Sequence, residues 1–230
     1  MSTSETALLP DHSVLSLVLK KLEAPILAFA LGAIPPITGL LAGWWGTLPS
    51  NSERWIARCA LAGLAIGLLI DTIFLRRWFR RRYAIPWLVW LGIFVFYSVG
   101  MFGFFMGVPA FNVALALPAG LVVGSKLAAS NCDSDCGRQI ILRACVSTTM
   151  VLTAVCVASA TIALLHPSTA SELQHMLNLG FEVTTAHVTG LIVVGGGALL
   201  VMHWTITAFV ARRTWQGWLS SADRLPGNER

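Results

Sequence analysis

The chain contains six long runs of apolar residues that carry almost no charge. A helix of about 18 or more such residues is long enough to cross the hydrocarbon core of a lipid bilayer. The composition agrees, because 56% of the residues are hydrophobic and only 12% are charged, whereas an average soluble domain has roughly 25% charged residues. The sequence therefore predicts an all-α polytopic membrane protein with six transmembrane helices and excludes a soluble domain.

The apolar runs divide the chain into three regions. We expect a membrane domain at residues 24–211, preceded by an N-terminal segment at 1–23 and followed by a polar tail at 212–230. The six expected spans lie at about 24–46, 56–75, 84–107, 109–126, 140–165 and 185–211. Asp11 can cap a short helix that is apolar on one side, with Lys20 and Lys21 on the other. This pattern predicts an interfacial amphipathic helix before the first span.

The basic residues indicate the orientation of the spans. If both termini are cytoplasmic, every lysine and arginine except Arg54 and Arg58 falls on the inner side. This distribution obeys the positive-inside rule and predicts an N-in, C-in protein of a cytoplasmic (inner) membrane. The net charge of +5 is thereby explained by the ends of the spans, without nucleic acid as a partner. The lipid bilayer is the expected partner.

Small residues recur at a spacing of four in several spans. The pairs are Gly39/Gly43, Gly63/Gly67, Gly103/Gly107 and Gly120/Gly124. Small residues let helix backbones approach closely inside a membrane. They predict a tightly packed bundle, with a homo-oligomer or a larger membrane complex as the second interpretation.

Asp71 is an ionisable residue inside an expected span. An ionised carboxylate in hydrocarbon costs several kcal/mol, so Asp71 should face a partner, water or the interior of the bundle. It precedes Arg76 and Arg77 by little more than one helical turn. An ion pair that anchors the helix end is one interpretation, and a proton- or cation-linked role is the other.

His203 lies at a similar depth in the last expected span, beside Trp204 and two threonines. An imidazole and the Asp71 carboxylate at one depth can form a hydrogen-bonded proton relay. A histidine packed against a neighbouring carbonyl group is the alternative. The sequence does not place the second and sixth spans side by side.

Prolines interrupt two expected spans. Pro35 and Pro36 lie in the middle of the first span, and Pro109 and Pro118 lie on either side of Asn112 in the fourth. Because proline lacks the backbone N–H, it disfavours a regular helix and frees carbonyl groups at membrane depth. Two such broken helices are typical of the midplane binding site of a secondary transporter, and Asn112 is the candidate solute ligand.

Three histidines fall in or beside the loop between the fifth and sixth spans, namely His166, His175 and His187. Imidazole can bind zinc, copper or iron, but their spacing matches no fixed motif. We therefore predict no cofactor and keep a metal or haem as an alternative. Cys132 and Cys136 provide half of a tetrahedral metal site, and their expected cytoplasmic location predicts two free thiols.

These residues favour a small transporter or channel-like protein for a small solute or ion, with Asp71, His203 and Asn112 as its candidate residues. A non-catalytic membrane subunit or assembly factor is the main alternative, and a metal- or haem-binding redox protein is a further one. No enzymatic motif is visible, and the sequence favours a protein that is not an enzyme.

Overall fold

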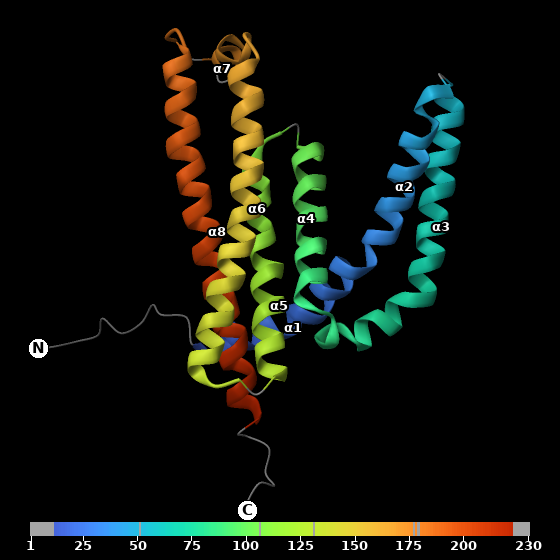
Figure 1. Ribbon diagram of the computed structural model, residues 1–230, viewed down its shortest axis with the longest axis vertical. Helices are drawn as coiled ribbons and strands as arrows, with labels where there is room; N and C mark the ends of the chain where they lie inside the picture. Colours follow the sequence, from blue (N-terminus) through green and yellow to red (C-terminus); the bar gives the residue numbers. More distant parts are fainter. Residues whose placement is uncertain are drawn as a thin grey trace, which may run out of the picture. The chain divides into compact units, whose positions relative to one another are not determined.

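The computed structural model is all-α and describes residues 12–50, 52–105, 107–130, 132–176, 178 and 180–222. It confirms six long apolar helical segments that could cross a membrane. Their bounds are Lys21–Ser50, Glu53–Arg80, Trp87–Phe104, Pro109–Ala129, Ser134–Leu165 and Thr185–Trp218. The chain forms two compact units, Met1–Pro86 and Trp87–Arg230, which are described separately below (Figure 1).

The described residues of the first unit form three α-helices and two short 3₁₀ turns. They are α1 (His12–Gly32), α2 (Ile34–Thr47), η1 (Leu48–Ser50), α3 (Glu53–Arg80) and η2 (Arg82–Ala84). The first apolar segment is broken at Ala33, between α1 and α2, and the two prolines that follow lie in the first turn of α2. Helix α1 continues without interruption through the expected boundary at residue 23. The predicted cap, Asp11, lies outside the described residues, and the interfacial position of this segment stays a prediction.

Helices α2 and α3 pack backbone to backbone, because glycines on both helices meet. A Cβ atom at Gly39 would overlap the carbonyl group of Gly63, and one at Gly43 would overlap that of Cys59. One turn further along α3, a Cβ atom at Gly67 would overlap the backbone of Pro35. The residues of α3 that face α2 are spaced by four, which places them on one side of the helix. The close packing predicted from Gly39/Gly43 and Gly63/Gly67 is confirmed.

The second unit is a helical bundle with one short helix in a loop. It contains α4 (Trp87–Phe104), η3 (Pro109–Leu115), α5 (Ala116–Ala129), α6 (Ser134–Leu165), α7 (Thr169–Met176) and α8 (Thr185–Ala222). Helix α8 packs against α5 and α6, and their core residues are Val123, Leu127, Ile141, Ala144, Cys145 and Ala211. In Figure 1, α6 and α8 extend beyond α5, and α7 lies near their far ends.

The remaining glycine pairs behave differently from each other. Gly120 and Gly124 face α8, and a Cβ atom at Gly124 would lie 2.6 Å from the carbonyl oxygen of Ala211. Close packing is therefore confirmed for this pair. Gly103 has no atom within 4 Å of its Cβ position, so the prediction of close packing is wrong there. Gly107 instead adopts φ +83°, a conformation that glycine enters without steric cost, and it turns the chain between α4 and η3.

Helix α8 continues past the expected end of the sixth span at residue 211 and ends at Ala222. Its 38 residues correspond to a length of about 57 Å at 1.5 Å per residue. Most side chains between Thr185 and Met202 are exposed, and the continuous buried row begins at His203. The second half of α8 is therefore the part that belongs to the core.

The prediction of two free thiols at Cys132 and Cys136 is wrong, because the structure joins their sulfur atoms in a disulfide. Helix α5 ends at Ala129 and α6 begins at Ser134, so only a short loop joins the two helices. The two Cα atoms lie 5.9 Å apart, within the separation of roughly 4.4–6.8 Å that a disulfide spans. The sequence argument relied on the redox state of the expected compartment and could not take this geometry into account.

Candidate functional site

Helix α4 presents one buried face to the interior of the second unit. Trp90, Phe94 and Ser98 are buried on it, and their spacing of four residues places them on successive turns of the same side. The indole nitrogen of Trp90 has no hydrogen-bond partner within the described chain. Two buried polar residues of the unit contact this face of α4.

His203 from α8 lies against this face. Its side chain is fully buried, at 0% exposure, and its ring makes an edge contact with Phe94 at 5.8 Å between ring centroids. Neither ring nitrogen has a hydrogen-bond partner among the described residues. The predicted alternative, a histidine bonded to a neighbouring carbonyl group, is therefore not what the structure contains.

Thr207 lies one turn further along α8, on the same side as His203. It is 1% exposed, and its hydroxyl group likewise lacks a partner in the described part of the chain. Buried threonines in a helix usually bond to a carbonyl group of the preceding turn. Thr148 of α6 does so with Ala144, at 3.0 Å. The hydroxyl of Thr207 therefore differs from that of Thr148, because no such bond is formed within the described residues.

Asn112 is held by the irregular segment η3, which packs against α4, α5, α6 and α8. Pro109 begins η3, and Pro118 lies in the first turn of α5 that follows. Asn112 is 1% exposed and donates from Nδ2 to the carbonyl oxygen of Ser98 at 3.3 Å. Its Oδ1 atom has no partner within the described residues.

Helix α4 thus brings two of the predicted residues into one region. Asn112 contacts Ser98 and His203 contacts Phe94, and these two α4 residues lie on successive turns, about 6 Å apart along the axis. Most buried polar groups in proteins are hydrogen-bonded, and a group left without a partner costs roughly 1–3 kcal/mol. His203, Thr207 and Asn112 are therefore three buried polar residues of the second unit, each with a polar atom that lacks a partner within the described residues, and we refer to these three residues as the cluster.

Asp71 belongs to the first unit, where it continues the row of α3 residues that face α2. A Cβ atom at Gly32 would lie 3.1 Å from Oδ2 of Asp71, so the carboxylate lies beside the break between α1 and α2. Pro35 and Pro36 offer no N–H groups there. The Oδ1 atom of Asp71 is buried without a hydrogen-bond partner within the described residues.

The structure contains no ion pair between Asp71 and either Arg76 or Arg77, although all three residues are described. The anchoring pair considered in the sequence is therefore not formed. Asp71 and His203 belong to different units, and a relay between them stays a prediction.

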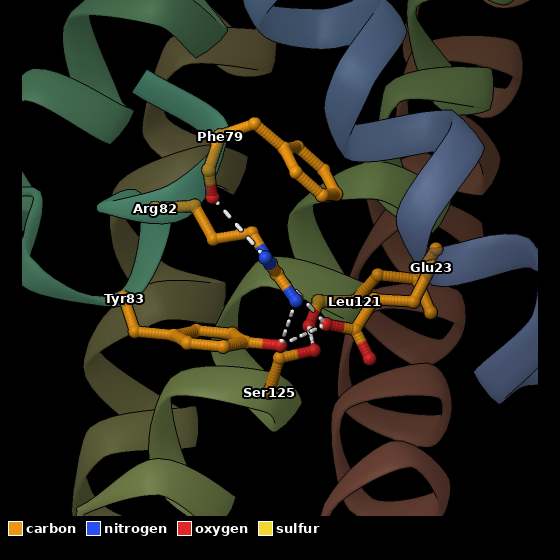
Figure 2. A network of polar contacts seen from close by, with 6 residues as sticks. All are labelled: Glu23, Phe79, Arg82, Tyr83, Leu121 and Ser125. Carbon is orange, nitrogen blue, oxygen red and sulfur yellow. Dashed lines mark hydrogen bonds and ion pairs between the residues drawn. The ribbon is translucent and has the colours of Figure 1, made fainter. Parts of the chain in front are cut away.

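A second polar network, which the sequence reasoning missed, connects α1 with the end of α3 in the first unit (Figure 2). Glu23 is 2% exposed and accepts a hydrogen bond from the hydroxyl of Tyr83 at 2.6 Å. Arg82 donates from Nη2 to the same hydroxyl at 2.8 Å and from Nη1 to the carbonyl oxygen of Phe79 at 3.1 Å. The Nε atom of Arg82 lies 4.0 Å from Oε1 of Glu23. The signal available in the sequence was Glu23 itself, a single acidic residue at the start of an apolar run.

Tyr83 provides a titration by which this network can be tested. Burial raises the pKa of Tyr83 to about 12, and the carboxylate of Glu23 adds to the increase, while Arg82 opposes it. Because the unfolded chain loses this proton near pH 10, the contribution of the network is complete below that pH and is lost as the pH rises towards 12. We expect ultraviolet difference titration to show a phenolate step near pH 12 that is missing in Tyr83→Phe. If the step lost in the variant lies near pH 10, the contact with Glu23 is absent.

The three histidines beside the loop are not brought together. His166 contacts the hydroxyl of Ser168 through Nδ1 at 2.9 Å, and His175 lies in the last turn of α7. The Nδ1 atom of His187 accepts from the backbone N–H of Thr184 at 3.1 Å, which satisfies a group at the start of α8. Within the described residues, no three histidine, cysteine or acidic side chains are placed to hold a metal ion.

No protein-family model, no curated protein and no solved structure matches this chain. The cluster of His203, Thr207 and Asn112 is therefore interpreted from its own geometry and chemistry.

Sequence reasoning identified His203 and Asn112 by residue type and missed the residues that position them. Trp90, Phe94 and Ser98 follow one another at intervals of four residues in a strongly apolar helix, and this spacing was the available signal for a common face. The missing back-bond of Thr207 has no signal in the sequence, because the same residue type forms that bond at Thr148.

Proposed function

We propose that the chain is a small proton-linked membrane transporter, in which the cluster of His203, Thr207 and Asn112 binds a small polar solute or ion. The observation that carries this proposal is the fully buried imidazole of His203, both of whose nitrogens lack partners within the described chain. The proposal includes an inner membrane with both termini cytoplasmic, as the basic residues indicate.

The chemistry of the cluster supports such a role. A neutral imidazole offers one donor and one acceptor, the carboxamide oxygen of Asn112 is an acceptor, and the hydroxyl of Thr207 can act as either. An imidazole nitrogen can accept and release a proton, so solute binding and proton binding can be coupled at this residue. Ionisable residues inside membrane helices mark proton relays and substrate pathways.

Asp71 is the second proton-linked residue of the proposal. Its carboxylate lies in a segment that could cross a membrane, beside the break between α1 and α2, without the expected arginine partner. A broken helix at membrane depth is a common place for a coupling ion. The proposal assigns Asp71 to proton binding and does not require direct contact with His203.

The proposal is tested by proton flux into vesicles that contain the purified full-length chain and a pH-sensitive dye. With an inward proton gradient, we expect flux above that of protein-free vesicles. We expect His203→Phe to reduce it at least about tenfold, because a positioned proton-transfer group contributes roughly 10²–10⁴-fold to a rate. Asp71→Asn is expected to reduce the flux in the same direction.

His175→Phe is the matched control, because it removes an exposed imidazole from the same unit and should leave the flux unchanged. If wild-type vesicles conduct no more than empty ones, or if His203→Phe conducts as well as the wild type, the transport proposal is wrong. Such a result would favour the alternative of a non-transporting membrane subunit.

A further inference from the structure

Five arginines lie within seven residues at the end of α3, and the structure separates them into two groups. Arg82 is turned towards Glu23 and Tyr83 and is half-buried. The other four are exposed and form no ion pair with any described residue. We call these four the arginine surface, and its members are Arg76, Arg77, Arg80 and Arg81.

The arginine surface covers the last turns of α3 and the residue after it. Arg76 and Arg80 are spaced by four, so they project along one side of the helix, while Arg81 follows directly after the last helical residue. The C-terminal end of a helix carries a partial negative charge, which favours cations there. This local field stabilises four neighbouring positive charges that have no acidic side chain to neutralise them.

Two aromatic residues of α3 are close in sequence to the arginine surface, one just before it and one between its members. Phe74 and Trp78 are both exposed, and their rings stack at 5.9 Å between centroids. Tryptophan prefers the depth of the lipid headgroups, where one part of its ring is apolar and the other is wet. Because α3 is an apolar segment that could cross a membrane, its terminal arginines reach the layer of lipid phosphates.

We propose that the arginine surface binds the phosphate groups of anionic phospholipids. The planar guanidinium group presents two parallel N–H donors that match two oxygens of a phosphate. A cluster of four or more basic residues directly after a membrane span is a common binding surface for acidic lipids. Arg82 does not take part, because it is half-buried and its guanidinium group is turned towards Glu23, Tyr83 and Phe79. This inference is independent of the transport proposal.

The test measures how strongly lipids associate with the full-length chain in phosphatidylcholine vesicles. Spin-labelled phosphatidylglycerol and spin-labelled phosphatidylcholine are compared by the fraction that the protein immobilises. For the wild type, we expect phosphatidylglycerol to be preferred about five- to tenfold. Replacing all four residues of the arginine surface by glutamine should reduce this preference to nearly one.

The matched control is Arg54→Gln/Arg58→Gln, which removes two exposed arginines from the opposite end of the same helix. Arg54 follows Glu53 directly, so this end carries less net positive charge, and the lipid preference should remain. A thermal midpoint equal to that of the wild type shows that each variant is folded, as expected for residues without partners.

The proposal is overturned if the wild type shows no preference for phosphatidylglycerol, or if the fourfold variant keeps it. It is also overturned if the control reduces the preference as much as the fourfold variant does. Millimolar inorganic phosphate distinguishes the source of the ligand. A preference that persists in phosphate supports a lipid headgroup, and its complete loss shows that free phosphate is the ligand.

Discussion

Replacing Gly39 by leucine is expected to lower the stability of the first unit by at least about 3 kcal/mol, the upper range for overpacked sites. A side chain at this position would overlap the carbonyl group of Gly63 on α3. A rotamer change cannot relieve the overlap, because the opposing atoms belong to the backbone. The two helices must therefore separate along their whole contact. Thermal unfolding of the purified chain, followed by tryptophan fluorescence, measures the effect.

Gly46→Leu is the matched control for this substitution. Gly46 lies two turns further along α2 and has no atom within 4 Å of its Cβ position. The same change in chemistry should therefore leave the thermal midpoint close to that of the wild type. Equal midpoints for Gly39→Leu and Gly46→Leu would contradict the contact between α2 and α3.

His203→Phe is expected to raise the thermal stability of the second unit, although the residue is fully buried. The substitution keeps an aromatic ring against Phe94 and removes two ring nitrogens that lack partners within the described residues. Relieving a buried unpaired polar group contributes roughly 1–3 kcal/mol. A residue that reduces stability in this way is typical of a functional site. A midpoint below that of the wild type would show that His203 has polar partners and stabilises the fold.

Thr214→Val is the matched control for this second prediction. Thr214 is also buried on α8, and its hydroxyl group likewise has no partner in the described chain. It packs against Gly124 of α5, two turns away from Thr207. Its replacement should increase stability without affecting proton flux, because Thr214 is not part of the proposed cluster.

The apolar runs were sufficient to predict the class of fold, because a helix in lipid must satisfy its own backbone and therefore has a minimum apolar length. The apolar runs did not predict where the individual helices end. The sequence predicted an end near residue 211, where Arg212 and Arg213 mark the limit of the apolar run, yet α8 continues to Ala222. Hydropathy reports where a helix leaves the lipid and does not report where its hydrogen bonds stop.

The contacts between helices were predictable only where a local pattern determines them. Gly39 and Gly63 indicated close packing because small residues at a spacing of four allow it. The network of Glu23 with Arg82 and Tyr83 joins positions about 60 residues apart, and no local rule connects them. The disulfide of Cys132 with Cys136 depends on how closely the loop brings the two residues together, which the expected compartment does not predict.

For the candidate residues as well, the sequence predicts which residues matter but not how they are arranged. His203 and Asn112 were identified because polar side chains are costly at membrane depth. Their arrangement depends on which faces of α4 and α8 meet, and the sequence does not specify this. Phe94 and Ser98 provide that information only through the fold, by contacting one of the two residues each.

The most direct test of the central claim is to measure thermal stability and proton flux on the same preparation of His203→Phe. The account predicts a higher thermal midpoint together with flux close to that of protein-free vesicles. Both results follow from one cause in the proposed function, namely two buried ring nitrogens that lack partners within the described residues and bind the transported species. A lower midpoint with unchanged flux would contradict the account and show that His203 is a structural residue.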